Sequence, residues 1–246
     1  MNDPMIDKRR NKWDQFMRFR YSRKLLAVGW CPLLLLTLVP AASVLAQAPA
    51  PERPAQPRIT SKPYTGDLSI FDYKDRAKKL HVARVMDILG IGRGKTVADI
   101  GAGSGWFSVR AAQRVTSAGL VYAVDINPEA IRYIQERVRR EGTSNIRTIL
   151  SKPEDPQLPA DAIDAVLLLK TYHEVANPVA LLGNLHKALR PNARIGIIDR
   201  NGNGENHGVD RDTVIREAGG AGYSLVGEYD FVKSDGEDYF LVFEPL

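Results

Sequence analysis

The sequence predicts an α/β fold: a doubly wound, Rossmann-like, mostly parallel seven-stranded sheet that ends in an antiparallel hairpin. Three observations support this prediction. Short apolar strands alternate with helical segments from about residue 76, and a glycine-rich turn follows the first of these strands. Near the C-terminus, two strand-like segments are joined by a short turn instead of a helix, which is typical of a hairpin.

The predicted elements follow one another in alternating order. Residues 75–91 carry apolar side chains at nearly helical spacing, and the continuous apolar runs further along are typical of buried strands. Asn127 caps a helix that Pro128 begins and Gly142 ends, and Pro178 begins another helix. The predicted strands are residues 96–100, 120–126, 146–150, 164–170, 194–199, 223–232 and 239–244, and the predicted helices are residues 75–91, 106–115, 128–141, 178–190 and 211–220.

The N-terminal segment is predicted to target or anchor the protein. Residues 1–24 hold eight Lys or Arg against three Asp, and residues 25–46 carry no charge. The apolar centre of this stretch has the length of a signal peptide and is shorter than the ~20 residues of a membrane span. Residues 1–46 are therefore predicted to be a signal peptide or an uncleaved membrane anchor, with membrane contact only through residues 25–46. We expect an exported (periplasmic or extracellular) or membrane-anchored domain, unless the segment fails to insert and leaves the domain in the cytoplasm.

The rest of the chain is predicted to be a linker and one domain. Residues 47–63 are proline-rich and are expected to be an extended linker before a folded domain at 64–246. Residues 47–246 contain 26 basic and 26 acidic residues, so no overall attraction to nucleic acid is expected. The only cysteine, Cys31, precedes the domain, which excludes a disulfide within it. The four histidines show no metal-ligand spacing, so no metal site is predicted.

The segment VADIGAGSGW, residues 97–106, is the strongest candidate for a ligand site. A glycine-rich turn after the first strand, with an acidic residue such as Asp125 at the end of the second, is the general nucleotide-binding arrangement. A carboxylate at that position can accept both ribose hydroxyls. A dinucleotide site needs a small residue where Trp106 stands, because the helix must approach the pyrophosphate closely. Trp106 therefore disfavours a dinucleotide.

S-adenosylmethionine fits these residues better, because it carries no phosphate. Its methionine part needs a close approach of the backbone, which the loop residues would supply. Asp99, two residues before the loop, would receive the ammonium group directly or through water. Alternatively, Asp99 caps backbone amides at the end of the strand. The loop residues predicted to contact the cofactor are Gly101, Ala102, Gly103 and Gly105.

Five motifs together point to a known family. They are VADIGAGSGWFS (97–108), VYAVDINPEAI (121–131), SKPEDPQLPADAIDAVLLL (151–169), YHEV (172–175) and LRPNARIGIIDR (189–200). With them, residues 76–246 resemble the class I S-adenosylmethionine-dependent methyltransferases. The resemblance implies that Asp99, Gly101 and Gly103 line the methionine side of the cofactor and that Asp125 binds its ribose.

The same resemblance implies three further cofactor contacts. Ile126 would flank the adenine, and Glu154 would lie near the rim of the adenine site. Lys170, at the end of the fourth strand, would face the cofactor. Alternatively, Glu154 is only a solvated loop residue.

The loop KTYHEVANP, residues 170–178, is predicted to face the methyl acceptor, because ligands bind at the carboxyl ends of parallel strands. A base helps methyl transfer only if the acceptor must lose a proton. Tyr172 and His173 are the predicted catalytic residues, with Glu174 beside them, and the ordinary pKa of histidine, about 6.5, suits a base. Alternatively, His173 and Glu174 only order the loop. Further residues that form either an acceptor wall or a flexible connector are Asp199, Arg200 and His207.

The sequence therefore predicts a methyltransferase that uses S-adenosylmethionine and acts on a small-molecule or lipid-like acceptor. The fourth strand is not followed by an Asn-Pro-Pro-Tyr motif, which disfavours amino methylation of DNA or glutamine. An exported, non-catalytic binding protein is the main alternative, because the cofactor is made in the cytoplasm. Trp106 and the lack of a Tyr-x-x-x-Lys pair disfavour a nicotinamide-dependent oxidoreductase.

Overall fold

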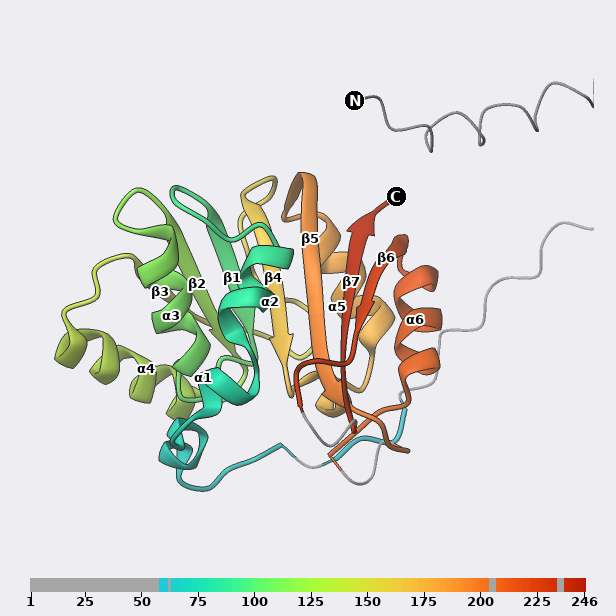
Figure 1. Ribbon diagram of the computed structural model, residues 1–246, viewed down its shortest axis with the longest axis horizontal. Coiled ribbons are helices and arrows are strands. Elements are labelled where there is room, and N and C mark those ends of the chain that lie inside the picture. Colours follow the sequence, from blue (N-terminus) through green and yellow to red (C-terminus); the bar gives the residue numbers. More distant parts are fainter. Residues whose placement is uncertain (1–57, 62, 204–206, 234–236) are drawn as a thin grey trace, which may run out of the picture. The chain divides into compact units, whose positions relative to one another are not determined.

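A seven-stranded sheet with the order β3-β2-β1-β4-β5-β7-β6 forms the centre of the fold (Figure 1). This computed structural model describes residues 58–61, 63–203, 207–233 and 237–246. The strands are β1 (Thr96–Ile100), β2 (Leu120–Asp125), β3 (Ile146–Leu150), β4 (Ile163–Leu169), β5 (Leu189–Arg200), β6 (Tyr223–Tyr229) and β7 (Asp238–Pro245). The helices are η1 (Leu68–Asp72), α1 (Arg76–Lys79), α2 (Val82–Ile88), α3 (Trp106–Val115), α4 (Pro128–Glu141), η2 (Tyr172–Glu174), α5 (Pro178–His186) and α6 (Arg211–Gly220).

The direction of the strands confirms the predicted fold class. The first five strands of the chain pair in parallel, so their carboxyl ends meet at one edge of the sheet. β7 lies between β5 and β6 and is antiparallel to both, as expected for the predicted C-terminal hairpin.

Alternate residues of the central strands pack into two cores on opposite faces of the sheet. On one face, Val97 and Leu167 pack with side chains of α2 and α3. On the other face, Ala98 and Leu168 pack with side chains of α5 and α6. Because β1 and β4 are covered on both sides, they are apolar along almost their whole length, which is why the sequence shows them as continuous apolar runs.

Two predicted helices have different boundaries in the structure. The predicted helix at 75–91 is divided into α1 and α2, because the backbone of His81 has a φ of 47°, in the left-handed region. The predicted helix at 178–190 ends at His186, and Pro191 lies inside β5. Pro191 is tolerated there because the pairing of β5 with β4 shifts register between Ile163 and Ala165.

The predicted signal peptide or anchor, residues 1–46, lies outside the described residues, as does most of the predicted linker. Within the described part of the chain, no helix is long and apolar enough to cross a membrane. Residues 58–61 and 63 already pack on the domain, and the backbone N–H of Arg58 donates to the carbonyl of Ala176 at 3.0 Å. The described residues that pack on the domain thus include some that precede residue 64, the predicted start of the domain.

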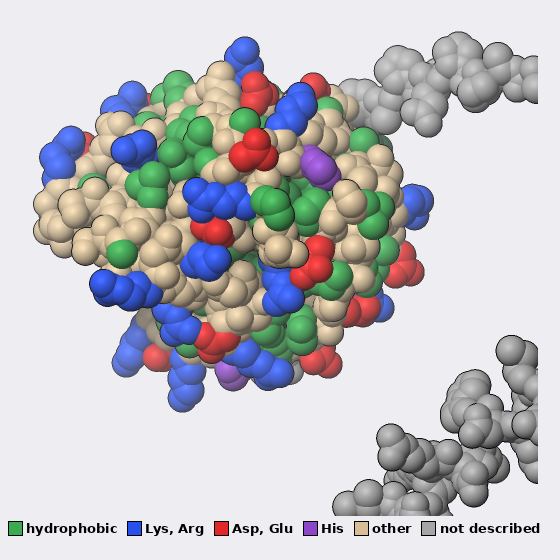
Figure 2. Space-filling model, turned by 90° about the horizontal axis from the view of Figure 1, so that it is seen from above, with side chains coloured by type: hydrophobic (Ala, Val, Ile, Leu, Met, Phe, Trp, Pro, Cys, Tyr) green, Lys and Arg blue, Asp and Glu red, His purple; other side chains and the backbone are tan. Residues whose placement is uncertain are grey.

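Charged side chains of both signs are mixed on the face seen in Figure 2. At the amino ends of the parallel strands, Asp164 forms ion pairs with Lys95 and Arg190, and Arg194 pairs with Glu244. This mixture agrees with the even balance of basic and acidic residues in residues 47–246.

Candidate active site

The glycine-rich turn after β1 follows a path that requires glycine. Gly101 and Gly103 have φ angles of 71° and 55°, in the left-handed region. A Cβ atom at Gly101 would lie 2.2 Å from Cγ2 of Thr171, so this glycine lets the turn pack against the loop after β4. A Cβ atom at Gly103 would have the ring of Phe71 as its nearest neighbour, at 3.8 Å. This distance is ordinary van der Waals contact, so the positive φ, and not a clash, favours glycine at this position.

Asp125, the last residue of β2, is held by the backbone around it. One carboxylate oxygen accepts the N–H of Gly103 at 2.8 Å, and the other accepts the N–H of Asn127 at 2.9 Å. Burial raises the pKa of Asp125, and these two hydrogen bonds oppose that rise. The carboxylate is thus fixed in direction beside the glycine-rich turn, where the sequence predicted a ribose ligand.

Asp99 is a buried carboxylate on β1, only 2% exposed. It accepts a hydrogen bond of 2.6 Å from the hydroxyl of Ser108 in α3. Burial raises the pKa of Asp99 to about 6, against the opposing effects of Ser108 and of the Arg76 guanidinium. A positively charged ligand group near Asp99 would relieve the cost of this buried charge.

Trp106 begins α3 and is buried between two guanidinium groups. The guanidinium carbons of Arg76 and Arg110 lie 4.4 and 4.0 Å from the centre of its ring, which is cation–π geometry. The indole also lines the cavity described next. The large residue at this position is explained by packing between α1 and α3.

A cavity of about 350 Å³ opens at the carboxyl ends of the parallel strands. This volume lies within the range of roughly 300–1,000 Å³ that is usual for small-molecule sites. The structure brings most of the predicted cofactor residues to its wall. Those that line it are Asp99, Gly101, Ala102, Gly103, Asp125, Ile126 and Lys170.

Residues 58–61 and 63–75, here called the N-terminal strap, run across this edge of the sheet (Figure 1). The Arg58 side chain holds one end of the strap, donating to the carbonyl of Val175 at 2.9 Å and to Glu217 at 2.8 Å. Sequence reasoning missed this wall because its first part is proline-rich, although the apolar pair Leu68 and Phe71 was a signal of burial. The strap residues that line the cavity are Thr60, Pro63, Tyr64, Leu68 and Phe71.

Tyr172, a predicted catalytic residue, lies in the core and does not line the cavity. Its ring is fully buried, and its hydroxyl donates to Glu217 at 2.9 Å. Burial raises the pKa of this phenol. The guanidinium of Arg58 lies 4.8 Å from the ring centre, so Tyr172 packs against the first residue of the strap. This position does not support a contact between Tyr172 and the acceptor.

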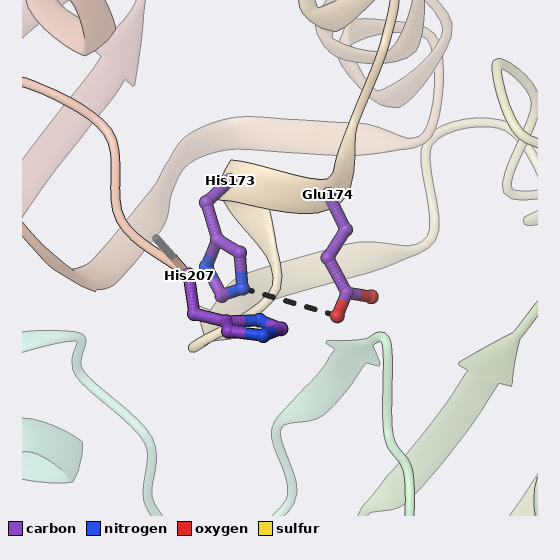
Figure 3. A group of neighbouring side chains, drawn as sticks. All are labelled: His173, Glu174 and His207. Carbon is purple, nitrogen blue, oxygen red and sulfur yellow. Dashed lines mark ion pairs between the residues drawn. The ribbon is translucent and has the colours of Figure 1, made fainter. Parts of the chain in front are cut away.

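His173 and Glu174 lie on η2 and point toward His207 (Figure 3). Nδ1 of the buried His173 lies 2.9 Å from a carboxylate oxygen of Asp199, at the end of β5. Nε2 of His173 lies 3.8 Å from Oε1 of Glu174, and the rings of His173 and His207 meet edge to face at 5.6 Å. Glu174 lines the cavity, and burial raises its pKa to about 6. Glu174 thus faces the cavity, whereas His173 does not line it.

Lys170, Gly105 and Glu154 were predicted to contact the cofactor, but of these three only Lys170 lines the cavity. Lys170 lines the cavity, but its ammonium is paired with the buried Asp238 of β7 at 2.5 Å. Gly105 packs toward α4, where an added Cβ would lie 3.0 Å from Ile134. Glu154 is exposed and contacts Asn177 instead of the cavity. Its neighbours supply that part of the wall and were missed by the sequence; they are Ser151, Lys152, Pro153 and Pro156.

The comparison with protein families identifies the family of the chain. A model described as "Methyltransferase domain" (Methyltransf_31) matches residues 91–215, just over half of the sequence. The chain belongs to this family. It is a class I methyltransferase, and its cofactor is S-adenosylmethionine, as the motifs around the glycine-rich turn implied.

Individual relatives of this methyltransferase are distant. The "Ubiquinone/menaquinone biosynthesis C-methyltransferase UbiE" of Enterobacter sp. is 24% identical over 115 residues, which cover 46% of each chain. The match thus spans about half the length of that relative. A SAM-dependent methyltransferase from Aquifex aeolicus has a TM-score of 0.67 at 22% identity, over 74% of this chain and 100% of its own. The [4+2]-cyclase SpnF has a TM-score of 0.56 at 13% identity, over 79% and 100%. These structures share the fold.

The cavity of this methyltransferase fits its cofactor. Gly101 and Gly103 line the cavity, so a ligand there can lie close to the backbone. Asp99 offers a buried negative charge for an ammonium group, and Asp125 offers carboxylate oxygens for the ribose. Ile126, which is 46% exposed on the cavity wall, offers an apolar surface for the adenine.

Proposed function

We propose that this methyltransferase acts on a small, largely apolar acceptor that carries an ionisable oxygen, such as a phenol or a quinol. One observation carries the proposal. The same cavity is lined both by the carboxylates that suit the cofactor and by apolar side chains of the N-terminal strap.

In this proposal, the residues around the glycine-rich turn bind and orient the cofactor. Asp99 receives the ammonium group, Asp125 the ribose hydroxyls, and Ile126 the adenine. S-adenosylmethionine supplies a methyl group that its sulfonium already activates. The protein therefore contributes mainly proximity and alignment of the two reactants.

The acceptor would lie between the strap and the loop after β4. Tyr64, Leu68 and Phe71 give this side of the cavity an apolar surface with two aromatic rings, 5.3 Å apart and nearly perpendicular. Glu174, whose carboxylate lies against the backbone of Tyr64, gives the same cavity a polar group. A ring with one ionisable oxygen matches both surfaces. The name of the distant UbiE relatives, which refers to quinone biosynthesis, supports the same class of acceptor.

The first test is calorimetric titration of the full chain with S-adenosylmethionine. We expect Asp125→Ala to weaken binding at least tenfold, because the ribose hydroxyls lose their acceptor. Asp87→Ala is the matched control, since Asp87 is an exposed carboxylate on α2 that pairs with Arg114. Equal affinity in the wild type and Asp125→Ala would contradict the proposed binding mode.

The second test is turnover with a panel of phenols, quinols and lipid-like analogues, followed by mass spectrometry of S-adenosylhomocysteine. We expect acceptor-dependent product with at least one ring compound. A folded chain that binds the cofactor but turns over no member of the panel would contradict the proposed acceptor class. It would favour the alternative of a non-catalytic binding protein.

A further inference from the structure

Three side chains of types that can ligate a metal ion converge beside the cavity: His173, Glu174 and His207 (Figure 3). Each offers one ligand atom, and these atoms all lie within 4.8 Å of one another. The 3.8 Å between Nε2 of His173 and Oε1 of Glu174 is too long for a hydrogen bond. Two ligands of a tetrahedral ion with bonds of ~2.0–2.1 Å lie about 3.4 Å apart. Small side-chain movements would therefore bring the three ligand atoms within bonding distance of one ion.

A second, independent observation concerns the far side of the His173 ring. Asp199 is fully buried, and its carboxylate accepts from Nδ1 of His173 at 2.9 Å and from the backbone N–H of the same residue at 3.0 Å. A proton held on Nδ1 leaves the lone pair of Nε2 directed at Glu174 and His207. Metal-binding histidines are commonly oriented by such a carboxylate behind them.

The charges of the cluster also match a cation. Two carboxylates, Glu174 and the fully buried Asp199, lie beside the ring of His173. The basic side chains closest to them in the sequence are paired with other carboxylates, Lys170 with Asp238 and Arg200 with Glu237. A divalent cation would balance both carboxylates.

We propose that His173, Glu174 and His207 bind a divalent transition-metal ion of the Zn²⁺ class, with Asp199 orienting His173. Two imidazoles and one carboxylate suit such an ion, whereas Mg²⁺ and Ca²⁺ prefer oxygen ligands. Three protein ligands leave a coordination position open. Because Glu174 lines the cavity, an oxygen of the acceptor can take that position. The role in acceptor binding rests on the proposed function, whereas metal binding itself does not.

The site was not predicted from the sequence because its ligands are not regularly spaced. His173 and Glu174 are adjacent, but His207 comes from the connection between β5 and α6. Only the fold brings β4 and β5 together and places both loops at one edge.

The test is a titration of the full chain, purified without a histidine tag and freed of metal with a chelator, with Co²⁺. We expect one equivalent to bind with the visible absorption of a low-symmetry Co²⁺ site and to be displaced by Zn²⁺. His207→Asn and Glu174→Gln should each weaken Co²⁺ binding at least tenfold. His207 is exposed, so its replacement tests the site without threatening the fold.

His81→Asn is the matched control. His81 and His207 are both exposed and have φ angles of 47° and 53°, where asparagine is tolerated, so the same substitution makes the same demand on the backbone. His81 contacts Phe231 and lies outside the cluster. Its replacement should leave Co²⁺ affinity unchanged.

Three results would overturn the proposal: no stoichiometric Co²⁺ binding, unchanged binding in both cluster variants, or an equal loss in His81→Asn. Calorimetry with S-adenosylmethionine on the same preparations separates the two proposals. A chain that binds the cofactor but not Co²⁺ leaves the proposed function standing and refutes the metal site. A chain that binds Co²⁺ but not the cofactor refutes the proposed function and leaves the metal site standing.

Discussion

The imidazole of His173 and the carboxylate of Asp199 form a buried pair, with Nδ1 of the histidine 2.9 Å from a carboxylate oxygen. The residues are 26 positions apart and meet because β4 and β5 are neighbours in the sheet. The carboxylate also accepts the backbone N–H groups of His173 and Arg200. Asp199 therefore fixes both the ring of His173 and the start of the loop that carries it.

We predict that Asp199→Asn destabilises the protein by about 1–3 kcal/mol, because an amide places an N–H₂ group among buried donors that need an acceptor. Urea denaturation measures this loss. The same variant should weaken Co²⁺ binding by about 10- to 100-fold, since the Asp199 carboxylate orients the imidazole of His173, which is one of the proposed metal ligands. Unchanged Co²⁺ affinity in a destabilised variant would show that Asp199 is only structural.

The second prediction concerns the pH dependence of cofactor binding. Asp99 must be ionised to receive an ammonium group, and its pKa in the free protein is raised to about 6. The affinity for S-adenosylmethionine should therefore fall as the pH drops below about 6. Ser108→Ala removes a hydrogen bond that stabilises the ionised form, so the midpoint should move to higher pH. Calorimetry at several pH values between about 5 and 8 measures the midpoint.

Ser224→Ala serves as the control for this shift. Ser224 lies on β6 and bonds to the carbonyl of Glu244, away from the cavity. Its replacement should leave the midpoint unchanged. A midpoint that does not move in Ser108→Ala would show that Asp99 does not govern cofactor binding.

The third prediction compares two glycines of the same turn. Gly101→Ala places a Cβ atom 2.2 Å from Thr171, in addition to the cost of a positive φ. Gly103→Ala has the same kind of φ but a nearest neighbour at 3.8 Å. The second change should cost about 1–2 kcal/mol of stability, and the first should cost clearly more. Denaturant titrations of both variants decide this, and equal losses would mean that the contact with Thr171 is unimportant.

The part of the site that the sequence predicts is the local part. Gly101, Gly103 and Asp125 follow directly from a strand-turn-helix pattern, and each lines the cavity. The strap was not predicted, because Arg58 and Glu217 are 159 residues apart and no local pattern joins them. The predicted export or anchoring of the chain concerns residues outside the described part and stays a prediction.

Tyr172 shows that the sequence predicts the position of a residue better than the direction of its side chain. Its place directly after β4 correctly put it near the carboxyl edge of the sheet, but the sequence does not tell which way a side chain turns in a short 3₁₀ helix. The phenol points into the core, toward Glu217, while Glu174, two residues later, faces the cavity. The loop motif thus named residues at the edge of the cavity, of which Glu174 lines it and Tyr172 does not.

The last prediction tests the N-terminal strap. Arg58→Ala removes the ion pair with Glu217, the hydrogen bond to Val175 and the contact with the Tyr172 ring. The two partners of the ion pair are each only 16% exposed, so the loss should be about 1–3 kcal/mol, more than for a surface pair. Because the strap would open first, limited proteolysis should cut residues 58–75 faster, and hydrogen exchange there should rise before the rest of the domain unfolds.

The Arg58→Ala variant also tests whether the N-terminal strap takes part in binding the acceptor or only stabilises the fold. If Tyr64 and Phe71 contact the acceptor, freeing the strap raises the KM for the acceptor while the affinity for S-adenosylmethionine, held by Asp99 and Asp125, changes little. Arg216→Ala is the control, because Arg216 is an exposed arginine beside Glu217 that donates to Thr213, three residues earlier. Faster proteolysis without a change in acceptor KM would mean that the strap stabilises the fold but takes no part in recognition.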